Sequence, residues 1–351
     1  MTDKELEIKN SDRPLITFAL FAFNQEKYIR EAIEGALSQT YEPLEIILSD
    51  DCSNDRTFEI MQEMAAAYRG AHRIVVRQSE INFGTALHVS AVGKRAKGRL
   101  IVVAAGDDIS IPTRVERLTD AWINAGMPNS LVHSNIVSFS DDNPENKTYR
   151  KPIILNNYNI ESYEKSKFQM FMPQSCAYSK ELFDTFPPLF GGSLIEDGPM
   201  FFRAILMGTP VYVDEGLVIQ RILNESAGTG YGIKNISKWN HFVMSRIIGA
   251  ITEIRDFHIY ERNYQNSLLT HKKLIEKRLS FIRNLSKCLF SPYWINNFFG
   301  KILISLTLIF FYRQNAPFYE RIYFVVGFLD KKNSPFIERL RRIAKSCKRP
   351  R

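Results

Sequence analysis

Short apolar runs and longer amphipathic stretches alternate along the first hundred residues of this chain. The apolar runs, which are typical of buried strands, cover residues 15–23, 44–48, 73–77 and 100–104. The stretches between them, which carry apolar side chains at helical spacing, cover residues 24–39, 58–68 and 86–97. Neighbouring parallel strands require crossover connections, which helices usually provide. The alternation therefore predicts an α/β fold with a mostly parallel sheet flanked by helices.

The pattern continues less regularly as far as residue 235. We expect a helix over residues 114–124, a strand over 130–140, a polar loop over 141–159, a helical run over 200–207 and a short strand over 211–213. Beyond residue 235 the chain becomes helical, basic and aromatic. We therefore predict two domains, residues 1–235 and residues 236–351.

Charge is divided unevenly between the two ends of the chain. Residues 271–351 hold 18 Lys and Arg against 4 Asp and Glu, and residues 1–270 hold 28 against 34, so the formal charges are +14 and −6. A basic end of this kind favours an anionic partner, either membrane headgroups or nucleic acid, and the alternative is a solvated basic face. The sequence carries no recognisable nucleic-acid-binding module. We therefore predict contact with an anionic membrane surface and no nucleic-acid partner.

The basic end also contains an apolar segment, residues 298–312, which is interrupted by Lys301. This segment is short for a membrane-spanning helix. An interfacial helix and a buried helix of a small carboxyl-terminal domain both fit its composition. Four scattered cysteines and a polar amino terminus indicate a reducing cytoplasm and no cleaved secretory signal. We expect a cytoplasmic protein, peripheral at the inner face of the cell membrane.

Two adjacent carboxylates, Asp107 and Asp108, closely follow the apolar run 100–104. Such a pair at the end of a buried strand costs free energy unless a cation offsets it. Open α/β sheets also bind their ligands at that edge. Mn²⁺ and Mg²⁺ prefer carboxylate and phosphate oxygens, so the pair predicts one of these ions as a cofactor. The alternative is that the pair caps a helix before Pro112.

Five motifs in this order resemble the inverting family 2 glycosyltransferases. They are FNQEKYI at 23–29, SQTY at 38–41, EIILSDDCSNDRT at 45–57, GRLIV through GDD at 98–108, and ED at 196–197. The resemblance covers roughly residues 15–226. It implies a GT-A (Rossmann-like) fold and transfer of a sugar from a nucleotide diphosphate to an acceptor hydroxyl.

The resemblance also implies a nucleotide-sugar site where the first strands end. Asp51 matches a carboxylate that accepts a hydrogen bond from the base, usually uracil, and an ionised carboxylate can only accept. Asp108 matches the direct metal ligand, and Asp107 a second contact to the metal or the sugar. The other nucleotide-sugar contacts that the resemblance implies are Ala22, Phe23, Asn24, Asn82, Gly84 and Arg221.

Asp197 resembles the family's general base, and Glu196 would position that base or the acceptor. An inverting transfer needs one carboxylate near the acceptor hydroxyl to take its proton. The alternative role of Asp197, capping a helix that begins near Pro199, is compatible with catalysis.

We therefore expect a metal-dependent, hexosyltransferase-type glycosyltransferase with a nucleotide-diphosphate sugar donor, UDP-sugar being favoured. The expected acceptor is a glycan or lipid-linked glycan in bacterial surface polysaccharide synthesis, such as O-antigen or capsule. The alternative is a non-catalytic nucleotide-sugar-binding module with a membrane- or polyanion-binding tail. Ala22, Phe23 and Ala105, which stand where the family commonly has Thr, Tyr and Asp, keep this alternative open.

Overall fold

The protein is described by a computed structural model that covers residues 13–152, 158–159, 162, 171–190, 196–223, 236–264 and 280. The chain divides into two compact units, residues 1–283 and 284–351, and all of the described residues belong to the first. The apolar segment 298–312 lies outside the described residues, so the interfacial helix and the buried helix both stay predictions. Among the residues that are described, no helix has the length and apolar character needed to cross a membrane.

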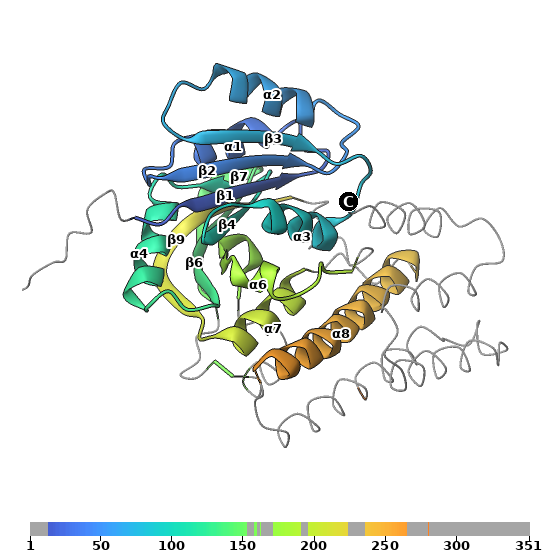
Figure 1. Ribbon diagram of the computed structural model, residues 1–351. Helices are drawn as coiled ribbons and strands as arrows, with labels where there is room; N and C mark the ends of the chain where they lie inside the picture. Colours follow the sequence, from blue (N-terminus) through green and yellow to red (C-terminus); the bar gives the residue numbers. More distant parts are fainter. Residues whose placement is uncertain are drawn as a thin grey trace, which may run out of the picture. The chain divides into compact units, whose positions relative to one another are not determined.

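Four parallel strands form the first half of the sheet, in the spatial order β3-β2-β1-β4. Their bounds are β1 (Ile16–Ala22), β2 (Leu44–Asp50), β3 (Arg73–Gln78) and β4 (Leu100–Ala105). The helices between them are α1 (Ile29–Leu37), α2 (Thr57–Ala67) and α3 (Thr85–Arg95). This alternation confirms the predicted α/β fold, which appears in the upper part of Figure 1.

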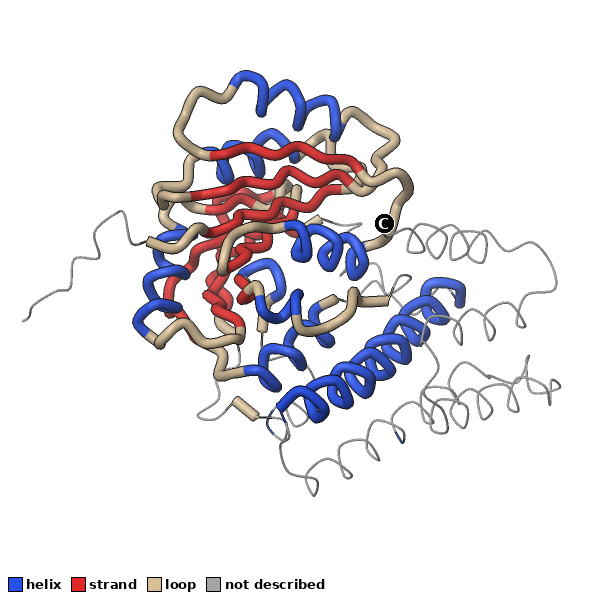
Figure 2. The backbone as a smooth tube through the Cα atoms, in the orientation of Figure 1, coloured by secondary structure: helices blue, strands red, loops and turns tan. Residues whose placement is uncertain are grey.

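The second half of the sheet, whose strands are drawn in red together with the first half in Figure 2, mixes parallel and antiparallel pairs. Its strands are β5 (Ile109–Ser110), β6 (Leu131–Ser140), β7 (Asn143–Arg150), β8 (Ala177–Ser179) and β9 (Val211–Ile222). Short β8 lies antiparallel between β4 and β6, and β9 runs parallel to β6 and antiparallel to β5. The sheet thus continues from the first four strands through β8 to the remaining strands.

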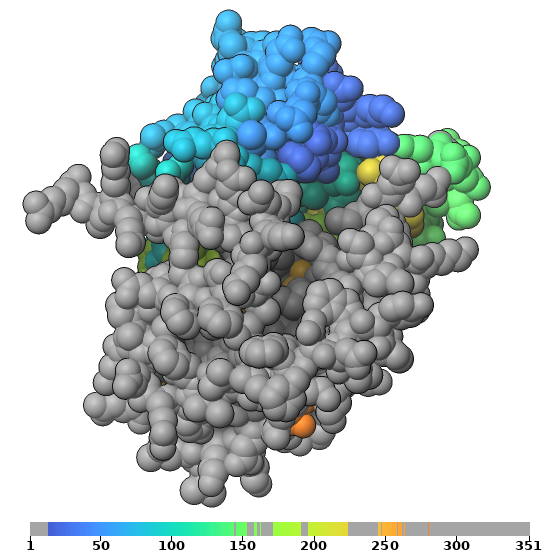
Figure 3. All heavy atoms as spheres, turned by 90° about the vertical axis from the view of Figure 1, so that its right-hand side faces the viewer, coloured from blue at the N-terminus to red at the C-terminus, as the bar shows by residue number. Residues whose placement is uncertain are grey.

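Two predicted elements differ from the structure. Residues 143–150, expected within a loop, form β7 and pair antiparallel with β6. The side chains of Asn143 and of residues 145–150 are exposed and mostly polar, so pairing with β6 defines this strand and no apolar pattern marks it. The green atoms of this hairpin lie at the surface in Figure 3. The predicted strand 211–213 extends to Ile222 because β9 pairs with β6 along much of its length.

Apolar side chains cover both faces of the sheet, as a sheet flanked by helices requires. On β1, Phe18 and Leu20 belong to a core cluster with α1, α2 and α4 (Arg114–Asn124), and Ala19 belongs to a second cluster. This split follows from the alternation of side chains along a strand. The second cluster includes residues of α3, α6 (Glu181–Asp184), α7 (Asp197–Met207) and α8 (Ile236–Tyr264). Helix α8 packs along α7 (Figure 1).

Candidate active site

The strand register brings the ends of β1, β2 and β4 to one edge of the sheet. Ala22 pairs with Asp50 on one side of β1, and Phe21 pairs with Ala105 on the other. The residues that follow, including Asp51 and Asp107, therefore leave the sheet at the same edge. The predicted nucleotide-sugar contacts that follow β1, β2 and β4 therefore lie at this edge.

Asp51 organises the loop that precedes α3. Its side chain is buried and accepts hydrogen bonds from the backbone N–H groups of Phe83 (2.9 Å) and Gly84 (2.8 Å). The side chain of Asn82 also accepts from the N–H of Gly84, at 3.0 Å. Gly84 is the N-cap residue of α3. Its φ of +76° is a backbone conformation that residues with a Cβ rarely adopt. Asp51, Asn82 and Gly84 thus form one connected unit.

The loop after β1 is tied to the loop after β2. Asn24, with φ +53°, donates its N–H to Ser53 Oγ at 2.8 Å and accepts from the N–H of Asn54 at 2.9 Å. Ala22 is buried, and its carbonyl accepts from the N–H of Asp51 at 2.9 Å. Phe23 is 41% exposed, which leaves its ring accessible beside this edge. A stacking surface for a planar ligand is compatible with that exposure.

Asp107 and Asp108 follow β4 directly. Burial and the neighbouring Asp107 charge raise the pKa of Asp108 to about 7, and burial also raises the pKa of Asp107. The backbone N–H of Arg221 donates to Asp108 Oδ1 at 3.0 Å, which joins the end of β9 to this pair. The positive charges of Arg114 and Arg221 act in the opposite direction on the pKa of Asp108. Two buried carboxyls side by side are a favourable place for a cation.

Arg221 is held by its side chain as well as its backbone. Its guanidinium pairs with Glu31 of α1 at 3.0 Å and with Asp141 at the β6–β7 turn. The rings of Tyr28 and Phe139 each lie 4.9 Å from the guanidinium carbon. Arg221 therefore places a fixed positive charge next to Asp107 and Asp108.

The second acidic pair, Glu196 and Asp197, lies where α7 begins. Asp197 accepts the N–H of Gly198, the next residue, at 2.7 Å. Asp197 is the first residue of α7, Glu196 is the N-cap residue, and no side chain makes a capping hydrogen bond, so the predicted capping role of Asp197 is wrong. Burial raises the pKa of both carboxyls; the Asp197 charge adds to the effect on Glu196, and the Arg246 charge of α8 opposes it on Asp197. Both carboxyls also raise the pKa of Tyr178 on β8, which places them beside that strand.

A buried arginine that the sequence interpretation missed connects the two acidic pairs. Arg114 is fully buried and donates to Ser110 Oγ (2.9 Å) and to the carbonyls of Val103 (2.8 Å) and Gln174 (2.7 Å). Val103 precedes the Asp107–Asp108 pair, and Gln174 precedes β8. A signal was present, because Arg114 stands four residues before Leu118 on the apolar stripe of α4.

Cys176 marks the same junction. Its carbonyl accepts from the N–H of Val103 at 3.1 Å, and the charges of Arg114 and Asp197 both influence the pKa of its buried thiol, in opposite directions. The chain of neighbours therefore runs from Asp108 through Arg114 and Cys176 to Asp197. The predicted base, Asp197, and the predicted metal ligands, Asp107 and Asp108, thus lie near the paired strands β4 and β8. Their roles stay predictions.

The two carboxylates fit a divalent ion by donor chemistry. Hard cations bind carboxylate oxygens, and a cation relieves the repulsion between Asp107 and Asp108. Within the ranges that the structure describes, no group of three or more His, Cys, Asp and Glu residues is arranged to hold a metal. An ion at this pair would therefore take its other ligands from a diphosphate or from water.

Gly106 allows β1 and the acidic pair to approach closely. A Cβ on this residue would lie 2.8 Å from the Cβ of Ala22 and 2.4 Å from Gln25 Oε1. The side chain of Gln25 in turn stabilises the ionised form of Asp107. We expect Gly106→Ala to weaken nucleotide-diphosphate binding at least tenfold while the protein stays folded, measured by isothermal titration calorimetry and circular dichroism. Unchanged affinity would show that this contact does not shape the site.

Comparison with known proteins gives a consistent identification. Residues 17–186 match the family model described as "Glycosyl transferase family 2". The structure resembles S. aureus TarS 1-349 in complex with UDP-GlcNAc, with a TM-score of 0.52, 16% identity and coverage of 77% of this chain and 81% of that one. This likeness shows the fold.

Curated relatives match over a shorter stretch. An uncharacterized protein of Mycobacterium tuberculosis is 40% identical over 88 residues, which is 25% of each chain. The Escherichia coli UDP-Glc:alpha-D-GlcNAc-diphosphoundecaprenol beta-1,3-glucosyltransferase WfaP is 33% identical over 101 residues, 29% of this chain and 38% of that protein. The matched stretch thus spans about a quarter to two fifths of these relatives' length. By the family match, the strand order and the site motifs together, residues 17–186 of this chain belong to glycosyl transferase family 2 and carry its GT-A fold.

Proposed function

We propose that this protein is an inverting glycosyltransferase that uses a nucleotide-diphosphate sugar, with Asp197 as the general base. One observation carries the proposal: Asp107–Asp108 follow β4, β4 pairs with β8, and Glu196–Asp197 lie near enough to Tyr178 of β8 to raise its pKa, so the two acidic pairs belong to neighbouring strands. A transfer reaction needs a cationic site for the diphosphate beside a base for the acceptor. The family match supports the same reaction class.

On the donor side, the nucleotide base would lie by Asp51 and Phe23, and the diphosphate by Asp107, Asp108 and Arg221. The UDP-GlcNAc complex of TarS supports a UDP-sugar as the donor of this chain. Asp108 and Asp107 would hold Mn²⁺ or Mg²⁺, which supplies positive charge against the diphosphate leaving group when bound. Arg221 adds its own positive charge next to the same oxygens.

On the acceptor side, Asp197 takes the proton of the acceptor hydroxyl as its oxygen attacks the anomeric carbon. Attack comes from the face opposite the departing diphosphate, so the configuration at that carbon inverts. The N–H of Gly198 holds one carboxylate oxygen of Asp197 in place. Glu196 sets the electrostatic surroundings of that base, since each carboxyl disfavours ionisation of the other.

A thermal-shift screen tests the proposed donor. UDP, GDP and their sugar derivatives are each added with and without Mn²⁺, and a ligand of the native state raises the melting temperature. We expect a UDP-sugar with Mn²⁺ to give the largest shift, and transfer to a glycan acceptor to stop with a chelator. Donor binding without hydrolysis or transfer would favour the non-catalytic nucleotide-sugar-binding module instead.

The pH profile gives a second test. The base acts only when it is ionised, and burial raises the pKa of Asp197 above the ordinary carboxyl value of about 4. Activity is therefore lost as the pH falls through this raised pKa, at a higher pH than an exposed carboxyl would require. We therefore expect the acid midpoint of kcat to lie above 4 with saturating donor. An acid midpoint at or below 4 would exclude Asp197 in its present surroundings as the base.

We further propose a role in bacterial surface polysaccharide synthesis at the inner face of the cell membrane. The printed name of WfaP, whose acceptor carries diphosphoundecaprenol, supports a lipid-linked glycan acceptor. The +14 charge of residues 271–351 supports binding to anionic headgroups. In cosedimentation, we expect binding to vesicles with phosphatidylglycerol that falls with added salt, and none to phosphatidylcholine vesicles. Equal binding to both would contradict the electrostatic contact.

A further inference from the structure

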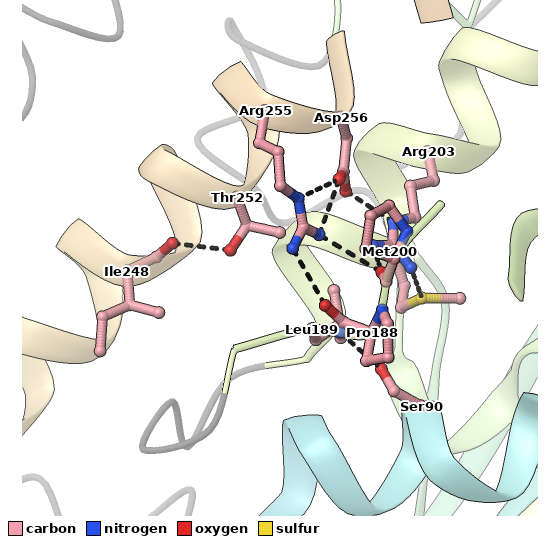
Figure 4. A network of polar contacts seen from close by, with 10 residues as sticks. Ser90, Pro188, Leu189, Met200, Arg203, Ile248, Thr252, Arg255 and Asp256 are labelled. Atoms are coloured by element: carbon pink, nitrogen blue, oxygen red, sulfur yellow. Dashed lines mark hydrogen bonds and ion pairs between the residues drawn. The ribbon is translucent and has the colours of Figure 1, made fainter. Parts of the chain in front are cut away.

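A buried carboxylate on α8 binds two arginines from different helices. Asp256 is 0% exposed; Arg203 of α7, 1% exposed, donates through Nε to its Oδ2 at 2.6 Å. Arg255, the neighbour of Asp256 on α8, donates through Nε to its Oδ1 at 2.8 Å. The two carboxylate oxygens therefore each hold one guanidinium (Figure 4).

Both guanidinium groups also hold the backbone of residues 186–190. Arg203 donates to the carbonyl of Pro187 at 2.7 Å, and Arg255 donates to the carbonyl of Pro188 at 3.0 Å (Figure 4). The ring of Phe186 lies 5.0 Å from the Arg203 carbon, and that of Phe190 lies 4.6 Å from the Arg255 carbon. We call Arg203, Arg255 and Asp256 the clasp.

The segment that the clasp holds, residues 186–190, also contacts α3. The N–H of Leu189, within the held segment, donates to Ser90 Oγ of α3 at 2.9 Å. Residues 186–190 are therefore fixed from α3, α7 and α8. The chain has only six further residues from Phe190 to Glu196. Arg203 stands six residues after Asp197 on the same helix, which is about 9 Å along its axis.

This arrangement fixes geometry more than it stabilises folding. The desolvation of buried ions largely offsets their attraction, so a buried ion pair is weak evidence for stability. Guanidinium forks, in contrast, are directional and bind two acceptors in one plane. The clasp uses that geometry to join the second half of α7 to residues 187–188 and to α8, all beyond the matched family residues 17–186.

We propose that Arg203, Arg255 and Asp256 are positioning residues that place Asp197 for attack by the acceptor hydroxyl. This inference rests on the proposed role of Asp197 as the base. Misplacement of a reacting group by about 1 Å lowers the rate about 100-fold. Loosening the clasp should therefore lower turnover and leave the donor edge, built from β1, β2 and β4, unchanged.

The test compares Arg255→Gln, Arg255→Lys and wild type. Arg255 is the preferred site because Asp256 keeps its contact with Arg203 when Arg255 is replaced. We expect Arg255→Gln to lower kcat per donor-binding site 10- to 100-fold, with the KM for donor within twofold of wild type. Arg255→Lys should recover part of kcat, because its ammonium still pairs with Asp256 but lacks the fork that binds two carbonyls. Dividing the maximal rate by the concentration of donor-binding sites corrects kcat for any unfolded protein in the sample.

The pH profile separates positioning from a change of ionisation. The groups that act electrostatically on Asp197 or respond to it are Glu196, Cys176, Tyr178 and Arg246. Arg255→Gln changes none of these, so the acid midpoint should stay within 0.3 pH units of wild type, about the precision of such a profile. Thr252→Val is the matched control on α8, since the hydroxyl of Thr252 donates within the helix to Ile248 at 2.8 Å (Figure 4). It should keep wild-type kcat.

The outcomes distinguish the clasp from the proposed function. Wild-type kcat in Arg255→Gln, with Asp197→Asn inactive, would overturn the clasp and leave the base assignment intact. A parallel loss of donor affinity in Arg255→Gln would overturn it as well. If Arg255→Gln does not fold, wild-type kcat in Arg255→Lys decides against the clasp. An active Asp197→Asn would reject the proposed base itself.

Discussion

Asp197→Asn is expected to lower sugar transfer by about 10²- to 10⁴-fold, the usual contribution of a general base. Asparagine has the shape of aspartate and can still accept the N–H of Gly198, so the start of α7 should keep its geometry. The amide cannot take a proton from the acceptor hydroxyl. Donor affinity should stay within twofold, because the donor edge contains none of the changed atoms. Steady-state transfer and calorimetric donor titration measure the two effects.

The control for this variant is Glu196→Gln. Burial and the Asp197 charge raise the pKa of Glu196 to about 8, so Glu196 is uncharged in the acid range where the base titrates, and the substitution changes no charge there. Transfer should therefore persist in this variant, with its acid midpoint unchanged. An Asp197→Asn variant that loses donor binding and transfer to the same degree would place Asp197 on the donor side and contradict its role as base.

Asp108→Asn is expected to have the second largest effect, a loss of nucleotide-diphosphate affinity of about 100-fold in the presence of Mn²⁺. The amide oxygen still accepts the N–H of Arg221, so the link to β9 remains. The charge that offsets a divalent ion is lost. Because the buried Asp107–Asp108 pair is relieved of repulsion, the variant should be at least as stable as wild type without ligand.

Two measurements check this expectation. Titration calorimetry with UDP and Mn²⁺ gives the affinity, and the melting temperature with Mn²⁺ alone reports on the ion without any donor. Asp120→Asn on α4, a partly exposed carboxylate paired with Arg13, is the matched control and should bind UDP as wild type does. If Asp108→Asn keeps its Mn²⁺-dependent affinity, the direct ligand lies elsewhere.

The strands with apolar sequences were predictable, and so were the helices between them. Strands β1 to β4 and helix α4 lie where the apolar spacing placed them, because burial on both faces leaves a clear pattern. The polar hairpin strand β7 was not predictable, since its residues are exposed and only pairing with β6 defines them. Most of β9 was missed because the exposed residues Asp214 and Glu215 interrupt its apolar pattern before the buried Leu217 and Val218.

The candidate site was predictable only as a set of positions. The acidic pairs could be found because carboxylates that follow apolar runs stand out in the sequence. The partners of these residues could not, since they are contacts between distant loops. Asp51 with Gly84 and Arg114 with Gln174 are examples, each fixed by how the chain folds back on itself. The charged residue in the apolar stripe of α4 was the one local sign of such a contact.

The packing of α8 on α7 determines where the chain can be shortened for biochemical work. A fragment that stops at residue 235 would leave Arg203 without Asp256 and expose to water the apolar side chains of α7 that pack against α8. We expect such a fragment to be poorly soluble, even if the donor edge built from β1, β2 and β4 stays folded. Expression trials and chimeras with related transferases should therefore keep residues 187–264 together as one exchangeable block.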